Sequence, residues 1–310
     1  MSRGHIVIIG GGAIGLSVAY HLGLRDARDV LLLERNRLTS GTSWHAAGVC
    51  GPLRSSYNLT VLARYGVELY ARLETETGQA TGFRQTGGMW LAQTEARMTE
   101  LRRIQATADM HGLHARLLTA NQARERFPLM NSDGLAGALW VDEDGQLNPV
   151  DLCMAYARGA RTSGATIREH CGVAELERNG TRITAVTLDS GERIEASTVI
   201  NCAGLWAGQI GAMAGVAVPL KAVEHMYVVT EPVDRLPDPC PILRDLDSGI
   251  YIKGDAGKLV LGQFESNARL WSPKSVDRGA DFLEFPENWD QAEPMLQAGI
   301  DRVPAFEQLG

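Results

Sequence analysis

His5-Ile-Val-Ile-Ile-Gly-Gly-Gly-Ala-Ile-Gly15 is the stretch that decides the fold. It opens with a short β-branched run, which is typical of a buried parallel strand. Gly10, Gly12 and Gly15 follow with G-x-G-x-x-G spacing, and residues 13–24 have the pattern of a helix. The three glycines allow a tight turn, a close approach of the backbone to a pyrophosphate, and close packing of the helix on the strand.

The residues after this helix complete a β-α-β unit. Val30-Leu-Leu-Leu33 is a second apolar strand, and Glu34 ends it. A carboxylate about 20 residues after the glycines is where the ribose of a dinucleotide is bound. It accepts hydrogen bonds from ribose hydroxyls and would repel a 2′-phosphate, while the N–H groups at the start of the helix face the pyrophosphate. The unit predicts a dinucleotide cofactor and leaves NAD and FAD open.

The composition limits the class of protein. The chain has 310 residues, of which 45% are hydrophobic, and its net charge is −7. It can bury a core larger than that of one average domain. The acidic balance argues against nucleic acid or an anionic membrane as the main partner.

The five cysteines are scattered, and none has C-x-x-C spacing, so we expect no metal site and a reducing compartment. The uncharged stretch from Gly4 to Leu24 is interrupted by glycines, which favours a strand, a turn and a buried helix over a membrane span. No targeting peptide precedes the first strand, so we expect a cytoplasmic protein.

A second stretch selects the cofactor and the family. Leu38-Thr-Ser-Gly-Thr-Ser-Trp-His-Ala-Ala-Gly48 resembles the T-S-G-T-[ST]-W-H-[AT]-A-G stretch of the sarcosine and dimethylglycine dehydrogenases. These are FAD-dependent oxidoreductases related to D-amino-acid oxidase, and their histidine is joined covalently to the flavin. The resemblance therefore implies FAD attached covalently through His45. A loop that leaves the second strand also lies at the carboxyl edge of the sheet, where cofactors bind.

The resemblance continues in order along nearly the whole chain. It reappears at residues 87–92, 144–149, 199–207, 224–231 and 300–304. Carried over residue by residue, it implies a cofactor site on the glycine turn, the end of the second strand, the histidine loop and the segment 199–207. The members of this site are Gly10, Gly12, Ala13, Ile14, Gly15, Glu34, Arg35, Thr42, Ser43, His45, Ala47, Gly48, Val173, Ala203, Gly204 and Trp206.

Together these patterns predict an α/β fold. A Rossmann-like FAD/NAD(P)-binding domain is joined to a second, discontinuous α+β substrate domain that is built on a mixed sheet. We expect the first domain at residues 1–80 and 145–215, with residues 297–310 leading back to it, and the second at residues 81–144 and 216–296.

Smaller elements are predicted from local patterns. Alternation predicts a hairpin over residues 182–195 and a separate buried strand over 197–202. Strands of the mixed sheet are expected at residues 227–230, 249–252 and 258–262. Residues 98–110 are expected to form a surface helix, and residues 270–294 are expected to be irregular.

The resemblance also implies the reaction. It is the oxidative demethylation of an N-methyl amino acid, sarcosine or dimethylglycine, by hydride transfer to flavin N5. The imine formed then yields glycine or sarcosine and a one-carbon unit. Because the amine must lose its proton before it gives up a hydride, a base is needed. His225 is the first candidate, since histidine has the right pKa range. Tyr251, on the neighbouring strand, is the second candidate and would hydrogen-bond the substrate.

The carboxylate of such a substrate favours an arginine or a lysine. Arg54 follows the flavin loop closely and is the tentative choice, while Arg244, Lys221 and Lys253 remain alternatives. The electron acceptor is an electron-transfer flavoprotein or oxygen, and the sequence does not decide between the two.

Two further points concern the whole chain. Relatives such as the pyruvate dehydrogenase phosphatase regulatory subunit keep this fold, so a non-catalytic regulatory or binding protein is the alternative function. The presence of His45 and His225 favours catalysis. Members of the family return to the FAD domain after the R-V-P segment, whereas only residues 305–310 follow it here. We therefore expect a chain that is truncated at its C-terminus and loads flavin poorly.

Overall fold

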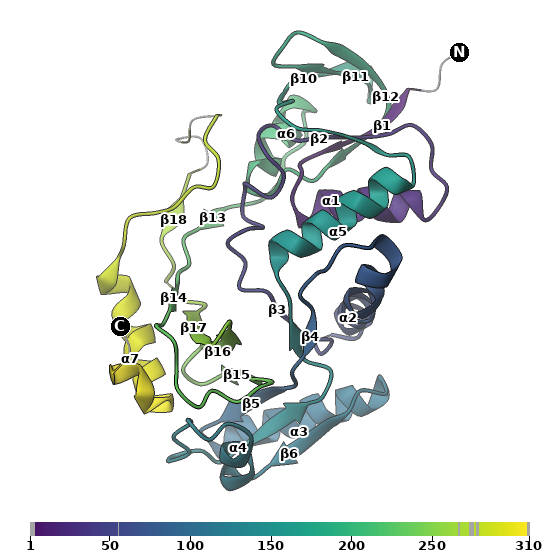
Figure 1. Ribbon diagram of the computed structural model, residues 1–310. Helices are drawn as coiled ribbons and strands as arrows, with labels where there is room; N and C mark the ends of the chain where they lie inside the picture. Colours follow the sequence, from purple (N-terminus) through teal and green to yellow (C-terminus); the bar gives the residue numbers. More distant parts are fainter. Residues whose placement is uncertain (1–3, 55, 266, 273–275, 277–278, 309–310) are drawn as a thin grey trace.

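The computed structural model describes residues 4–54, 56–265, 267–272, 276 and 279–308. Two large sheets organise these residues, and they lie one above the other in Figure 1. The fold is α/β, with a Rossmann-like unit around the upper sheet and a mixed lower sheet, as the sequence predicts. The exact domain limits remain a prediction.

The upper sheet has the strand order β10-β11-β12-β1-β2-β9. Its central strand is β1 (His5–Ile9), which pairs in parallel with β2 (Val30–Leu33) and β12 (Arg193–Asn201). Helices α1 (Ala13–Gly23) and α5 (Pro149–Thr162) pack on each other over one face (Figure 1). The remaining strands are β9 (Thr166–Arg168), β10 (Val173–Asn179) and β11 (Arg182–Leu188), and η1 (Gly204–Trp206) and α6 (Ala207–Met213) follow β12.

The hairpin predicted around Gly191 is confirmed, because the Gly191 N–H donates to Leu188 O at 2.9 Å. The prediction of a separate strand after it is wrong. β12 is continuous: residues 193–195 pair antiparallel with β11, and the strand then pairs in parallel with β1. Glu195 and Ser197 are both exposed, on the solvent side of one strand that changes its partner. Residues 197–202 were also expected to be buried, but they are exposed or half-buried.

The lower sheet has the order β14-β17-β16-β15-β5-β7-β6. β15 runs parallel to β5, and every other neighbouring pair is antiparallel. The three predicted strands at its β14 side are confirmed. The strands are β5 (Gly88–Ala92), β6 (Ala115–Leu118), β7 (Gly137–Val141), β14 (Tyr227–Val229), β15 (Ile242–Asp245), β16 (Ile250–Asp255) and β17 (Lys258–Gln263).

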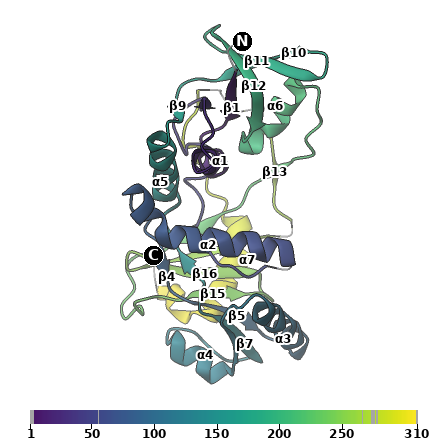
Figure 2. The ribbon, with the colours of Figure 1, turned by 90° about the vertical axis from the view of Figure 1, so that its right-hand side faces the viewer.

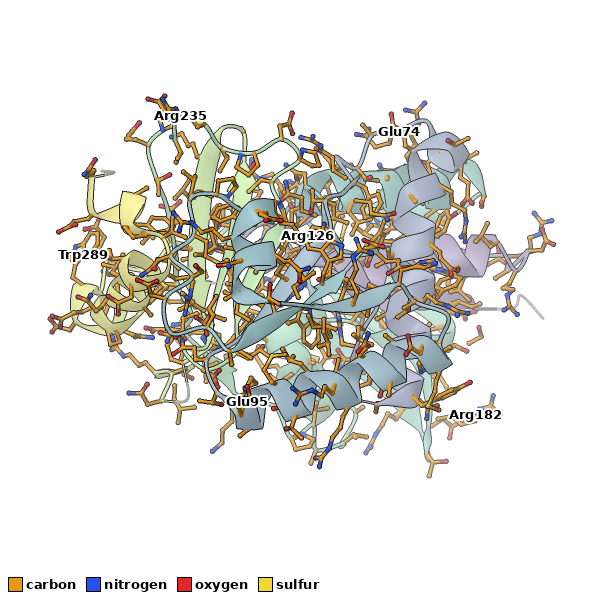
Figure 3. The ribbon with its side chains drawn as sticks, turned by 90° about the horizontal axis from the view of Figure 1, so that it is seen from below. Glu74, Glu95, Arg126, Arg182, Arg235 and Trp289 are labelled. Carbon is orange, nitrogen blue, oxygen red and sulfur yellow. The ribbon has the colours of Figure 1, made fainter. Side chains whose placement is uncertain are left out.

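Three helices pack on the lower sheet. They are α3 (Glu95–Met110), the predicted surface helix, α4 (Ala120–Arg126) and α7 (Trp289–Arg302). In Figure 3, seen from below, Arg126 at the end of α4 lies near the middle of the view and Trp289 at one edge. The guanidinium of Arg126 lies 4.2 Å from the centre of the Trp140 ring on β7.

The prediction of an irregular stretch over residues 270–294 is partly wrong. β18 (Leu270–Trp271) pairs with β13 (Ala222–Val223), and α7 begins at Trp289 although Pro294 lies inside it. A proline inside a helix costs about 3 kcal/mol. The buried face of α7, formed by Ala292, Met295 and Gly299 against the lower sheet, offsets this cost.

Residues 297–310 were expected to lead back towards the first domain. Residues 309 and 310 lie outside the described part of the chain, and residues 297–308 stay with the lower sheet, because η3 (Pro304–Gln308) folds back on α7. Arg302 anchors this end of the helix through an ion pair of 3.0 Å with Asp245, and both side chains are buried.

The two halves meet around small elements. A short sheet lies between the two halves and consists of β3 (Val49–Cys50), β4 (Arg84–Gln85) and β8 (Gly145–Gln146). Figure 2 shows α2 (Tyr57–Thr77) lying between the two halves. Within the described ranges, no helix combines the length and the apolar character needed to cross a membrane.

Candidate active site

A cavity of about 530 Å³ opens at the carboxyl ends of β1 and β2. Its walls come from the glycine turn, the end of β2, the loop before β3 and the segment after β12. The predicted cofactor residues line this cavity, with the exceptions of Gly15, His45 and Ala47. Residues that are far apart in the sequence are therefore brought together at the edge of the sheet where cofactors bind in this kind of fold.

The glycine turn has the shape that a pyrophosphate requires. Gly10 has a φ of 116°, and a Cβ on it would lie 2.4 Å from Cys202 O. A Cβ on Gly15 would lie 1.9 Å from Gly10 O, so Gly15 serves the packing of helix on turn and does not line the cavity. The N–H of Ala13 is held by Ser43 Oγ at 2.9 Å, which ties the histidine loop to the start of α1.

Glu34 is held at the cavity by two backbone N–H groups. Its Oε2 accepts from the N–H of Gly11 at 2.7 Å, and its Oε1 accepts from the N–H of Asn36 at 2.8 Å. A carboxylate has about four acceptor positions, so lone pairs remain for hydroxyl groups in the cavity. Next to it, the guanidinium of Arg35 lies 4.5 Å from the centre of the Trp206 ring, and both residues line the cavity.

His45 lies beside the cavity and not in its wall. Its Nε2 is 2.6 Å from Leu283 O, and its ring centre is 3.7 Å from that of Trp44. Its neighbours Ser43 and Ala46 do line the cavity. The sequence did not indicate the contact with Leu283.

Residues 280–283 contact the loop that carries His45 and the residues just before it. Asn36 Nδ2 donates to Ala280 O at 2.8 Å, Arg37 pairs with Asp281 at 2.9 Å, and the N–H of Phe282 donates to Ser40 O at 3.2 Å. Together with the contact of His45 to Leu283 O, these make four contacts between residues 280–283 and residues 36–45 of the upper half.

Arg54 lies at a second cavity, of about 560 Å³, between α1 and α2. The two cavities share Ile14, Val49, Cys50 and Tyr70 in their walls. Partial burial and the nearby charge of Arg244 lower the pKa of Arg54. Among the described residues, Arg54 has no carboxylate within ion-pair distance, so an anionic ligand would stabilise it.

The other cations proposed for a carboxylate are placed differently. Arg244 contacts the buried Asp144, and Lys253 pairs with Asp255 at 3.4 Å. Lys221 is exposed in the segment before β13. Of the four, Arg54 is the one that lines the cavity next to the cofactor cavity and has no carboxylate partner among the described residues.

Tyr251 belongs to a row of side chains on one face of the lower sheet. The register sets Trp90, Arg244, Tyr251, Gly262 and Tyr227 opposite one another on successive strands. Residues directly opposite in neighbouring strands share a face. Because Arg244 and Trp90 contact Asp144 near Cys50, this face is turned towards the loop that carries Arg54. Burial raises the pKa of Tyr251 to about 12, so its hydroxyl remains a donor.

His225 lies between β13 and β14, and its Nδ1 contacts Glu265. The ring of Phe264 joins the two candidate catalytic residues, with its centre 5.5 Å from His225 and 5.8 Å from Tyr251. Neither His225 nor Tyr251 lines either cavity described above. Glu265 was missed in the sequence, where it looks like an ordinary acid after a strand.

Comparisons with known proteins agree with this geometry. The family model described as "FAD dependent oxidoreductase" matches residues 5–310. The chain is 38% identical over 304 residues to 4-methylaminobutanoate oxidase (formaldehyde-forming) of Paenarthrobacter nicotinovorans, covering 98% of this chain and 37% of that protein. It is 36% identical over 315 residues to mitochondrial sarcosine dehydrogenase of Mus musculus, covering 100% of this chain and 34% of that protein.

The fold has a close match among solved structures. The crystal structure of L-proline dehydrogenase from P. horikoshii superposes with a TM-score of 0.87 at 23% identity, over 99% of this chain and 79% of that one. At this identity the match shows the fold alone. The chain spans little more than a third of the length of the two curated relatives above.

Proposed function

The chain belongs to the family of FAD-dependent oxidoreductases, and we propose that it catalyses the oxidative demethylation of an N-methylamino carboxylate. Sarcosine and 4-methylaminobutanoate, the substrates in the names of two relatives, each carry a methylamine and a carboxylate. The observation that carries the proposal is Arg54, a cation without a carboxylate partner in the described chain, beside the cofactor cavity.

The residues present fit FAD. The glycine turn and the start of α1 would hold the pyrophosphate, Glu34 the ribose, and Arg35 with Trp206 the adenine. When bound, FAD supplies the oxidant that accepts the hydride of the methyl carbon.

The chain's own residues do the rest of the chemistry. The guanidinium of Arg54 would bind the carboxylate through charge-assisted hydrogen bonds. Nε2 of His225 would take the ammonium proton, and the hydroxyl of Tyr251 would hydrogen-bond the substrate. Water then hydrolyses the imine to formaldehyde and the demethylated amino acid. Arg54 and the pair His225–Tyr251 come from different halves, so the substrate would bind where the two halves face each other.

We further propose that the cofactor is attached covalently through His45. Support comes from the motif around His45 and from Ser43 and Ala46, which line the cavity on either side of it. Nε2 of His45 donates to Leu283 O in the structure, so Nδ1 of the neutral ring has the free lone pair that would form the bond.

A substrate panel tests the proposal. The flavin-loaded protein is given sarcosine, dimethylglycine or 4-methylaminobutanoate, with glycine as the control that lacks the methyl group. Formaldehyde, dye reduction and oxygen uptake are measured. We expect one formaldehyde for every two electrons transferred, from at least one methylated compound and not from glycine. A protein that holds FAD and oxidises none of them would support the regulatory alternative.

A further inference from the structure

Glu265 joins three elements of the lower half at His225. It follows β17, and its side chain is only 6% exposed. Its Oε2 contacts His225 Nδ1, before β14, and its Oε1 accepts from Gln291 Nε2 of α7 at 2.9 Å. A buried carboxylate with two side-chain donors is held in one orientation, so the imidazole that it contacts is held as well.

The contact determines where the imidazole carries its hydrogen. A carboxylate only accepts hydrogen bonds, so Nδ1 of His225 is the donor. In the neutral ring, Nε2 then has the free lone pair. The ring is partly open, with its edge towards Phe264, and no described residue hydrogen-bonds to Nε2. Nε2 is therefore available to a proton from a ligand.

Glu265 is ionised in this setting. Its burial acts to raise its pKa, but hydrogen bonds from His225 and Gln291 outweigh this effect, and the pKa of Glu265 lies below its usual value. Among the described residues, the titratable groups close to this pair in the chain or on the neighbouring strands are the phenols of Tyr227 and Tyr251 and the more distant pair of Glu224 with Arg269, 4.0 Å apart. Both phenols have raised pKa values and remain neutral. Glu265 is thus the carboxylate in direct contact with His225.

We propose that Glu265 is a positioning residue that makes Nε2 of His225 the base for the substrate ammonium. The inference rests on the proposed function and adds a residue to it. In the step, the N–H bond of the ammonium breaks, its electron pair stays on nitrogen, and the proton binds Nε2. The imidazolium that forms is paired with the carboxylate of Glu265, while the neutral amine can now release a hydride.

The test is the pH dependence of amine oxidation, with the hydrogen on the His225 ring as a second readout. Nitrogen NMR of the flavin-loaded wild type should show the ring hydrogen on Nδ1, as the contact with Glu265 requires. In Glu265→Gln the imidazole no longer faces a negative charge, and an opposite charge in contact shifts a protonation equilibrium by about 1–3 pH units. The rising limb of kcat/KM against pH should therefore move to lower pH by about one unit or more, and the plateau should fall about 10-fold or more because the base is weaker.

Two further variants sharpen the test. Glu224→Gln removes the same charge one residue from the histidine, and it should leave the pH profile and the rate unchanged. Gln291→Met removes one donor from Glu265, so the carboxylate favours the imidazolium more and the rising limb of kcat/KM should move to higher pH. This opposite shift also provides the answer if Glu265→Gln does not fold.

An unchanged pH profile in a folded Glu265→Gln protein, or in a folded Gln291→Met protein, would overturn the inference. A failure of the proposed function would give a different result. A wild-type protein whose His225 carries its ring hydrogen on Nδ1 but that oxidises no N-methylamine would keep the pairing and remove the reaction.

Discussion

Tyr251 lies across Gly262 on the neighbouring strand of the lower sheet. A Cβ built on Gly262 would come within 2.3 Å of the phenol oxygen of Tyr251. The absence of a side chain at Gly262 thus provides the space in which the tyrosine ring lies, between Arg244 on one side and Tyr227 on the other.

Gly262→Ala should therefore displace the hydroxyl of Tyr251. We expect the rate of amine oxidation to fall about 10-fold, the lower end of what the loss of a positioned polar group costs, with little loss of stability because the far end of a side chain can move. Steady-state rates and thermal unfolding are measured together. In a Tyr251→Ala background the same change should have no further effect on the rate, since the two residues are in contact. Additive losses would mean that Gly262 acts in another way.

Replacing Arg54 tests the binding of the substrate carboxylate. A hydrogen bond to a charged group contributes about 1.5–3 kcal/mol, so Arg54→Met should raise KM about 10- to 100-fold. The value of kcat should change less, because the group is remote from the reacting carbon. Lys221→Met is the matched control, since Lys221 is exposed and lines neither cavity. Equal KM values in the wild type and Arg54→Met would assign the carboxylate to another cation.

The parts of the site that follow from the sequence are those in which each residue acts close to its own place in the chain. Gly10, Gly15 and Glu34 serve one β-α-β unit, so their spacing alone predicts their roles. By contrast, His45 and Leu283 are 238 residues apart, and His225 and Glu265 are 40 apart. Such pairs depend on how the sheets and residues 270–294 fold back, and a local pattern does not encode that.

The helix α7 is a similar case. Pro294 indicates irregular structure on local grounds, and only the tertiary contacts of Met295 and Gly299 with the lower sheet outweigh it. The proline is visible in the sequence, whereas the surface on which the helix packs is not.

His45→Ala tests covalent attachment. Acid denaturation of the wild type should leave flavin fluorescence on the polypeptide, and the variant should release all of its flavin. The variant should still bind FAD, because the glycine turn and Glu34 are unchanged. His21→Ala serves as the control, since His21 lies on α1 and bonds Tyr65 at 2.8 Å. Release of flavin from the wild type and from His45→Ala alike would refute the attachment.

The last prediction concerns stability and compares two ion pairs of the lower half. Arg302 and Asp245 are 8% and 2% exposed and lie 3.0 Å apart, whereas Arg116 and Asp142 are 47% and 34% exposed and lie 2.9 Å apart. Distance alone would rank the two pairs as equal. Removing one partner of a buried pair leaves a charge without compensation and costs about 3–5 kcal/mol, whereas an exposed pair contributes about 0–1 kcal/mol.

Arg302→Met should therefore lower the free energy of unfolding far more than Arg116→Met does. Both variants replace an arginine by methionine, so the comparison depends on the burial of the pair. Arg302 Nη1 also donates to Asn131 O at 2.8 Å. The substitution therefore also removes a hydrogen bond between the end of α7 and the segment before β7. Denaturant unfolding of the flavin-loaded proteins measures both values under the same cofactor saturation, which is needed because bound FAD stabilises the native state. Similar losses in the two variants would show that Asp245 finds another partner, for which Gln93, at 3.1 Å from its carboxylate, is already in place.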